Sequence, residues 1–154
     1  LHNEYEDRVA FVYRHFPLTE IHPNAFDESR AISCAGIVGG KKGLQDYINS
    51  LYGEKFSKQD PNTLRFPQLA QNGKDIIAKN IGLDAVKFSS CMSTKQTEQI
   101  VKDSINDGIA AGVQGTPSTY VLLKTRKGYE VVSMVDGARP YEFFKAVIDE
   151  ALTR

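Results

Sequence analysis

Two cysteines, Cys34 and Cys91, are the residues of this chain that could carry redox chemistry or bind a metal. They stand too far apart in the sequence to form the Cys-x-x-Cys pair of a dithiol active site. Two separate buried thiols and one structural disulfide are both consistent with them. A zinc site made of these cysteines and the histidines lacks the ligand spacing of zinc proteins, so we expect no metal.

The stretch Gly115-Thr116-Pro117 is the second candidate for chemistry. It joins a helical pattern that ends at Gly112 to an apolar, β-branched run over residues 118–123. Pro117 has no N–H and therefore suits the first residue of a strand, and Gly115 permits backbone shapes that other residues resist. Only about 5–6% of X–Pro bonds are cis, so these residues alone leave a trans or a cis bond open.

His15 is the third candidate, because it ends an apolar run over residues 8–14 that predicts a strand covered on both faces. The ends of parallel strands border active sites in open α/β sheets, which makes His15 a candidate neighbour of an active site. A polar residue that merely ends a strand is the simpler interpretation. His2 and His22 are expected at the surface or in turns.

Helices and a hairpin must position these residues. Pro23 at a first helical position, Gly39-Gly40, Asp84 and Pro140 mark where helices begin or end. The periodicity predicts a short helix end over 1–7, the strand over 8–14, five helices, a hairpin and a last helix. The five helices are expected over residues 23–38, 42–52, 67–80, 85–91 and 93–111, the hairpin strands over 118–123 and 129–135, and the last helix over 140–152. Asp136-Gly137 should end the second hairpin strand, and Val86 and Phe88 should face inward on the fourth helix. The fifth helix should bury one stripe whose glycines suggest close packing on another element such as the sheet; the stripe consists of Ile100, Val101, Ser104, Ile105, Gly108, Ile109 and Gly112.

The composition is that of an ordinary globular protein. The chain has 154 residues, which suggests one domain, with 41% hydrophobic and 25% charged residues. Lysine plus arginine equals aspartate plus glutamate at 19 each, which argues against nucleic acid or an anionic membrane surface as the main partner. The chain shows no signal peptide and does not begin with methionine, so we expect a processed chain or a fragment.

The order of three stretches resembles a known family, the DsbA-like thioredoxin-fold proteins, which are thiol-disulfide oxidoreductases of the protein disulfide isomerase kind. The resemblance implies an α/β, thioredoxin-like fold with a helical insertion. Its core would comprise residues 1–18 and 112–154, and the insertion residues 19–111. The stretches that carry it are Val9–Leu18 with Ile21–Ala25, Ile81–Asp84 with Phe88–Cys91, and Ala110–Val121.

The resemblance also implies roles for the candidate residues. Thr116–Pro117 would be a cis bond opposite the active-site dithiol, and Gly115, Thr116 and Pro117 would bind substrate as an added strand. Some members carry a second, noncatalytic disulfide in the helical part, which would pair Cys34 with Cys91. Closing that loop would stabilise the fold by about 4 kcal/mol on the chain-entropy model. No organic cofactor is implied, because the chemistry belongs to sulfur.

The sequence departs from the family pattern at one important point, because it contains no Cys-x-x-Cys. Residues 1–7 resemble the tail of the helix that begins with this dithiol. We therefore expect that the first core strand and the start of that helix are missing by truncation, with a divergent protein as the alternative. The chain itself should not catalyse dithiol oxidation by the usual mechanism, and its incomplete sheet should rearrange, dimerise or exchange strands.

The parent protein is therefore expected to oxidise or isomerise disulfides outside the cytoplasm, in the periplasm, as a secreted protein or as a membrane-anchored domain. Its partners would be cysteine-containing protein substrates and a redox partner protein, and no nucleic acid. A noncatalytic thioredoxin-fold module that binds peptides is the alternative. Glutathione-dependent transferases share the fold but are less consistent with the Val113–Val121 phrase.

Overall fold

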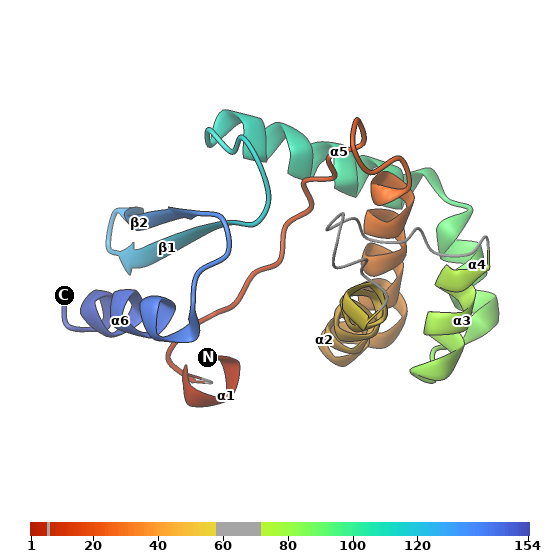
Figure 1. The fold of residues 1–154 in the computed structure, drawn as a ribbon, viewed down its shortest axis with the longest axis horizontal. Coiled ribbons are helices and arrows are strands. Elements are labelled where there is room, and N and C mark those ends of the chain that lie inside the picture. Colours follow the sequence, from red (N-terminus) through yellow and green to blue (C-terminus); the bar gives the residue numbers. More distant parts are fainter. Residues whose placement is uncertain (6, 58–71) are drawn as a thin grey trace. The chain divides into compact units, whose positions relative to one another are not determined.

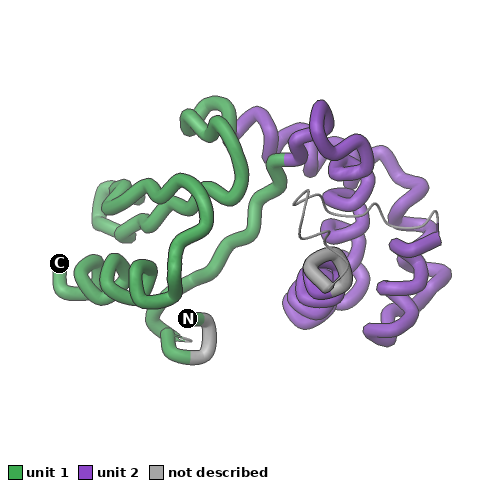
Figure 2. Tube along the Cα trace, viewed as in Figure 1, with its two compact units in different colours: residues 1–16, 108–154 green, residues 17–107 purple. Residues whose placement is uncertain are grey.

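The computed structural model describes residues 1–5, 7–57 and 72–154. The chain divides into two compact units, one made of residues 17–107 and the other of residues 1–16 with 108–154 (Figures 1 and 2). The first is helical throughout its described elements. The second contains the hairpin and the Gly115–Pro117 stretch. The order of elements is α1, α2, α3, α4, α5, β1, β2 and α6.

The helical unit begins with α2 (Ala25–Ser57), which breaks at Gly40 with φ 62° and ψ −157°. The predicted break at Gly39-Gly40 is therefore confirmed, and it divides α2 into two helical segments. The predicted end near Tyr52 is wrong, because the helix continues to Ser57. Residues 53–57 include good helix formers, so propensity outweighs the single Gly53. The predicted start of the next helix, residues 67–71, lies outside the described residues. Within the described residues this helix is α3 (Gly73–Asn80).

Helix α4 (Ala85–Met92) begins at Asp84, whose Oδ1 accepts a hydrogen bond of 2.9 Å from the backbone N–H of Lys87. The predicted N-cap is therefore confirmed. Phe88 is 1% exposed, but Val86 is 76% exposed. The expectation that both point inward is wrong, because an eight-residue helix packed along one side buries a single stripe.

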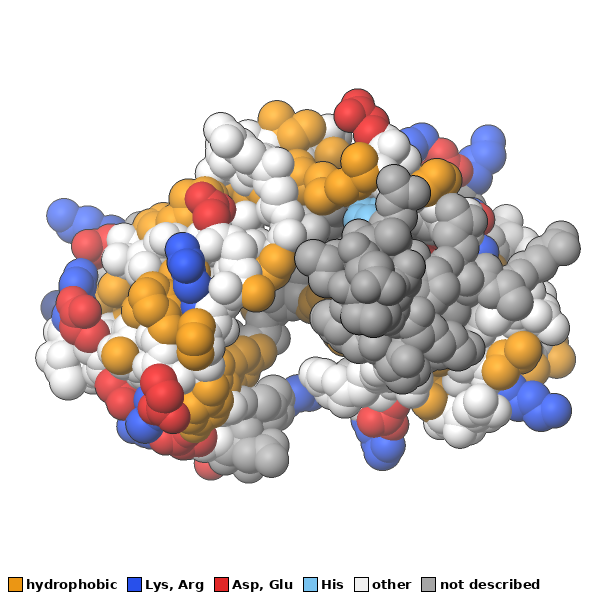
Figure 3. Space-filling view, in the orientation of Figure 1, with side chains coloured by type: hydrophobic (Ala, Val, Ile, Leu, Met, Phe, Trp, Pro, Cys, Tyr) orange, Lys and Arg blue, Asp and Glu red, His pale blue; other side chains and the backbone are white. Residues whose placement is uncertain are grey.

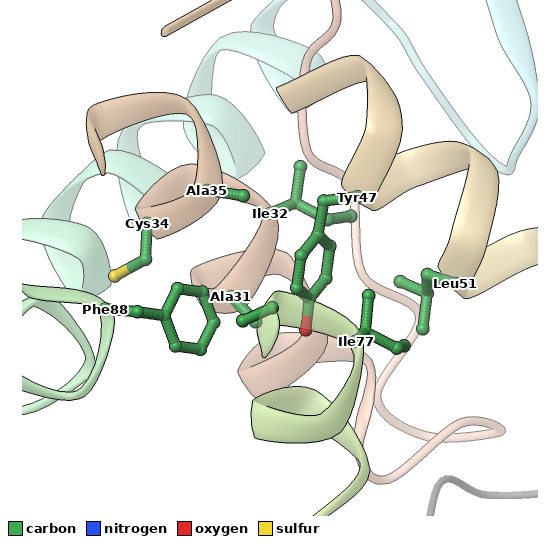
Figure 4. Packing of buried hydrophobic residues seen from close by; sticks show 9 residues of the cluster. Ala31, Ile32, Cys34, Ala35, Tyr47, Leu51, Ile77 and Phe88 are labelled. Atoms are coloured by element: carbon green, nitrogen blue, oxygen red, sulfur yellow. The ribbon is translucent and has the colours of Figure 1, made fainter. Parts of the chain in front are cut away.

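The core of the helical unit is a cluster of buried residues from α2, α3 and α4. The rings of Tyr47 and Phe88, two members of this cluster, stack with centroids 5.8 Å apart (Figure 4). The Tyr47 hydroxyl donates to the carbonyl of Lys74, which satisfies a polar group inside the core. The other buried members are Ala31, Ile32, Cys34, Ala35, Leu51, Ile77 and Ala78.

Helix α5 (Lys95–Ala110) follows, with Val101 and Ser104 buried and Ile109 mostly exposed. The predicted stripe of α5 is thus confirmed in its middle and wrong at Ile109. We expected its glycines to permit close packing, with the sheet as the suggested neighbour. A Cβ added at Gly108 would stand 2.6 Å from Cδ2 of Phe16, so the close neighbour is this phenylalanine.

The second unit contains α1 (His2–Tyr5), β1 (Ser118–Thr125), β2 (Gly128–Asp136) and α6 (Tyr141–Leu152). The two strands pair antiparallel as predicted, from Ser118 opposite Asp136 to Thr125 opposite Gly128. The register shifts between Val121 and Leu122, which is a β-bulge. Helix α6 lies beside the hairpin and contacts β1 (Figure 1).

The predicted strand over residues 8–14 is wrong, because residues 9–18 are neither helix nor strand. A strand requires a neighbour to complete its ladder, and the sheet of the described residues consists of β1 and β2 paired with each other. Phe11, Val12 and Tyr13 are exposed, so the segment is not covered on both faces. The pattern of apolar residues indicated an extended chain but could not supply a partner strand.

One face of the hairpin also carries exposed apolar side chains. Leu122 and Val131 face each other across the ladder, and Tyr129 and Met134 are exposed as well. Apolar side chains accordingly reach the surface of this unit (Figure 3). The opposite face, which includes buried Val135, is the one that can pack against α6.

Candidate functional site

The approach to the Gly115–Pro117 stretch is fixed by the end of α5. Gly112 has φ 83°, a left-handed conformation that favours glycine and stops the helix. The N–H of Val113 then bonds the carbonyl of Gly108 at 2.9 Å. The hydroxyl of Tyr120 in β1 donates to the carbonyl of Ala111 at 2.5 Å. The segment just after α5 and strand β1, which flank the Gly115–Pro117 stretch, are therefore joined by a hydrogen bond.

The stretch itself, which we call the proline loop (residues 114–118), turns into β1 at Pro117. The peptide bond between Thr116 and Pro117 is cis. The carbonyl of Pro117 accepts a hydrogen bond of 2.8 Å from the N–H of Gly137, which follows β2. Gly137 has φ 77°, so this contact uses a backbone conformation that glycine adopts most readily.

A serine and an aspartate complete the fastening of the proline loop. The hydroxyl of Ser118 lies 2.9 Å from the carbonyl oxygen of Gly115 and 2.9 Å from Oδ1 of Asp136. Ser118 and Asp136 are also opposite each other at the end of the ladder. From the sequence alone, Asp136 is expected only to end the second hairpin strand. Its position at the end of the predicted hairpin, opposite Ser118, was the signal that could have revealed it.

A hollow of about 260 Å³ lies at the proline loop, lined by residues 114–118 together with Asp136 and Gly137. Gly115 does not have the positive φ that its role as a permissive residue suggested, whereas Gly112 and Gly137 do. A Cβ added at Gly115 would meet no atom within 4 Å. The small residue at this position therefore keeps the hollow open.

Thr116 presents its backbone at the edge of this hollow. Among the described residues, none forms a hydrogen bond with the N–H or the carbonyl of Thr116, and its side chain is exposed. Pro117, the next residue, has no N–H to offer. An extended peptide could therefore pair with Thr116 in the manner of an added strand.

His15 is buried at 6% exposure, and its ring meets that of Tyr13 edge-on with centroids 5.3 Å apart. Burial, together with the charge of Arg14, lowers the pKa of His15 to about 4. The imidazole is therefore neutral at physiological pH. His15 does not line the hollow at the proline loop. Its role as an active-site neighbour stays a prediction.

Cys34 and Cys91 are joined by a disulfide with a Cα–Cα distance of 5.7 Å. The bond links α2 to α4 within the helical unit, and Cys34 is fully buried. Neither sulfur lines the hollow. Nearby, the guanidinium of Arg30 donates to the carbonyl of Met92 at the end of α4, so the same two helices are joined twice.

A group of polar residues that the sequence analysis missed joins α1 to α6. Lys145 lies 2.7 Å from Glu4 and 2.9 Å from Asp149, and the buried Tyr5 donates to Asp149 at 2.7 Å. Tyr141 donates to Glu4. We call these five residues the lysine clamp. Its hydrogen bonds raise the pKa of Lys145, with Glu4 the main cause, and lower the pKa of Glu4 and of Asp149.

Comparison with known proteins gives one family. The sequence pattern of the family described as "DSBA-like thioredoxin domain" matches residues 66–149, which is more than half of the chain. The match includes the proline loop, the hairpin and Cys91. No solved structure matches the chain.

The curated relatives are much longer proteins. The chain is 27% identical over 132 residues to the Na(+)/H(+) antiporter NhaA 1 of Mycolicibacterium gilvum (strain PYR-GCK) and to the protein of the same name from Mycobacterium sp. (strain KMS). Each match covers 84% of this chain and 19% of the antiporter, so the chain spans about a fifth of these relatives. Within the described ranges, no helix is both long enough and apolar enough to cross a membrane.

Proposed function

The chain belongs to the DSBA-like thioredoxin domain family, as its sequence predicted, and we propose that its proline loop binds protein substrates for thiol-disulfide exchange. The thioredoxin-like α/β fold class is confirmed by the same match. The observation that carries the proposal is the unpaired Thr116 backbone beside an open hollow, at a fixed turn. Residues 1–18 with 112–154 would be the thioredoxin core, and residues 19–111 the inserted helical part.

The proposed reaction is an exchange between two sulfur pairs. A thiolate attacks a substrate disulfide, one substrate sulfur leaves as a thiolate, and a mixed disulfide forms. A second thiol of the same dithiol then displaces the remaining substrate sulfur, so that the substrate gains two electrons and the dithiol becomes a disulfide. Substrate oxidation is the reverse. The 154 residues contain no Cys-x-x-Cys, so in this proposal they supply substrate binding and not the dithiol.

Each contact of the proline loop has a part in this proposal. Pro117 and Thr116 leave the loop edge open to an extended substrate, while Gly115 keeps the space beside it clear. The hydroxyl of Thr116 is available to a sulfur held next to it. The bonds from Gly137 and Tyr120 keep the loop in place before substrate arrives, which lowers the entropic cost of binding.

Partners and location follow as part of the proposal. The substrates would be cysteine-containing proteins outside the cytoplasm, and a redox partner protein would restore the dithiol. The antiporter relatives, of which the chain covers 19%, support a domain that works as part of a longer protein. Ion exchange is the named activity of those longer proteins, and we do not extend it to this chain. Self-association through the exposed hairpin face also stays a proposal.

The test uses a variant that fills the hollow. Gly115→Leu adds a side chain where a Cβ meets no atom within 4 Å, so the fold should tolerate it. Gly53→Leu is the matched control, because a Cβ there also meets no atom and Gly53 lies in the helical unit. A fluorescent peptide with a central S-methylcysteine should bind the unchanged chain and the control equally, and Gly115→Leu at least tenfold more weakly. Equal binding to Gly115→Leu would refute the site.

The alternative function is a noncatalytic module that binds peptides at the same loop. It is supported by the absence of Cys-x-x-Cys from the sequence. Peptides that differ only in a central S-methylcysteine, serine or alanine separate the two functions. A preference for the sulfur-containing peptide supports an exchange site, and equal affinities favour the module.

A further inference from the structure

The hollow beside the proline loop contains one charged residue. Asp136 is the member of its lining that carries a full charge, and the other lining residues are neutral. Its Oδ1 lies 2.9 Å from the Ser118 hydroxyl, which is a neutral partner. Throughout the described residues, no lysine or arginine forms an ion pair with Asp136. The hollow therefore presents a negative charge that no cation of the described chain offsets.

The position of Asp136 relative to Thr116 places this charge beside the proposed path of substrate. Asp136 is paired with Ser118 at the end of the ladder, and Ser118 is two residues from Thr116. A peptide that pairs with Thr116 as an added strand has side chains that alternate between two sides. A neighbour of the residue held at Thr116 would then direct its side chain into the hollow. About 260 Å³ gives room for one long side chain.

We propose that Asp136 makes the proline loop select substrate segments that carry a positively charged side chain, arginine above all, next to the residue bound at Thr116. The inference rests on the proposed function and adds a substrate class to it. A guanidinium is planar and matches a carboxylate with two parallel hydrogen bonds, whereas an ammonium offers a point charge. Oδ1 is shared with Ser118, which holds the carboxylate in a fixed orientation for this contact.

The expected preference is modest, because Asp136 is exposed to solvent. Ion pairs at such positions change affinity by a few-fold, so an arginine peptide should bind about threefold more tightly than its glutamine counterpart. A glutamate at the same position should weaken binding below that of glutamine. The preference should shrink as salt is added, because ions screen exposed charges.

The test is a titration of the chain with three unreactive peptides that differ at one position, arginine, glutamine or glutamate, beside a central S-methylcysteine. Each is measured with the unchanged chain, with Asp136→Asn and with Glu130→Gln. Glu130→Gln is the matched control, because it removes one exposed carboxylate from the same strand at a position that does not line the hollow. The amide signals of Gly115, Thr116 and Gly137 report where each peptide binds.

For the unchanged chain and for Glu130→Gln, we expect affinity to decrease from the arginine peptide to the glutamine peptide to the glutamate peptide. For Asp136→Asn, we expect the three peptides to bind with equal affinity. Equal affinities for the unchanged chain, with shifts at the proline loop, would overturn the selection by Asp136 and leave the proposed function intact. An arginine preference that persists in Asp136→Asn would also overturn it. If no peptide shifts the loop signals, the proposed function and this inference both fail.

Discussion

The two units of the chain differ in how completely they bury their apolar residues. The helical unit encloses Tyr47 and Phe88 in a cluster from three helices and joins α2 to α4 with a disulfide. The second unit (residues 1–16 with 108–154), which we call the hairpin unit, buries Val135 and Ile148 but leaves Leu122, Tyr129 and other large side chains exposed. Yet the hollow, the proline loop and Asp136 lie on the hairpin unit. Stability is thus concentrated in one unit and the candidate binding site in the other, as is common where sites occupy less buried segments.

The largest effect should come from the centre of the helical core. Phe88→Ala removes a fully buried ring that stacks on Tyr47, and we expect a loss of about 3–5 kcal/mol in the free energy of unfolding. Val86→Ala on the same helix removes an exposed side chain and should cost less than about 0.5 kcal/mol. Urea denaturation followed by circular dichroism measures both. Similar losses for the two variants would contradict the described core.

The disulfide should have the next largest effect. Reduction of Cys34–Cys91 frees a long loop in the unfolded chain, and such bonds typically contribute about 2–4 kcal/mol. The urea midpoint should therefore fall in the presence of reductant. The amide signals of β1 and β2 should not move at low urea, because the bond lies in the helical unit. Coincident midpoints with and without reductant would show that the bond adds no stability.

His15 should make the hairpin unit sensitive to mild acid. Its pKa is lowered to about 4, whereas an unfolded histidine titrates near about 6.5. Between these values the unfolded state binds a proton that the folded state does not, so the free energy of unfolding decreases as the pH falls from about 6.5 to about 4. The full loss would approach about 3 kcal/mol. Nuclear magnetic resonance titration of the imidazole gives its pKa directly.

A variant that lacks the imidazole gives the control. His15→Gln should flatten the dependence of stability on pH over the window from about 4 to about 6.5. A His15 pKa near the ordinary value of about 6.5 would mean that the ring is in contact with water.

The lysine clamp should have the smallest effect, because its charges are accessible to solvent. In the folded chain Lys145 lowers the pKa of Glu4, and the Tyr5 hydroxyl together with Lys145 lowers the pKa of Asp149. Their contribution to stability is present above their unfolded pKa and is lost as the pH falls through the folded pKa. Lys145→Gln should raise the pKa of both carboxyls, and Lys124→Gln in the hairpin should change neither. The pKa values of Glu4 and Asp149 can be measured from the nuclear magnetic resonance signals of their carboxyl carbons as the pH is varied. Unchanged pKa values in Lys145→Gln would disprove the clamp.

Much of the fold could be predicted from the sequence because the residues that favour turns, helix ends and strands locally lie where the packed structure has those elements. The break at Gly39-Gly40 and the Asp84 cap depend on interactions between near neighbours in the chain, and the hairpin forms around the short turn between Thr125 and Gly128. The prediction of a strand over residues 8–14 is wrong, since a strand depends on a partner strand that the periodicity of the sequence does not reveal. The prediction that Val86 faces inward is wrong for a related reason. The buried face of a short helix is decided by tertiary contacts, which the sequence does not reveal.

The candidate site was predictable in part. Thr116 and Pro117 were visible in the sequence because proline and glycine mark turns. Asp136 and the lysine clamp were not, since Asp136 contacts Ser118 18 residues away and Lys145 contacts Glu4 more than 100 residues away. Asp136 acquires its meaning only when the hairpin brings it opposite Ser118. Charged residues far apart in sequence are the ones that the fold had to bring together.

The most direct test of the central claim is a nuclear magnetic resonance titration. The backbone amide signals of the chain are followed while a peptide that carries a central S-methylcysteine is added. If the proline loop binds substrate, the signals of Gly115, Thr116, Ser118 and Gly137 should shift together with one dissociation constant, while those of α3 and α4 stay fixed. Shifts confined to the helical unit, or no shifts at any peptide concentration, would contradict the account.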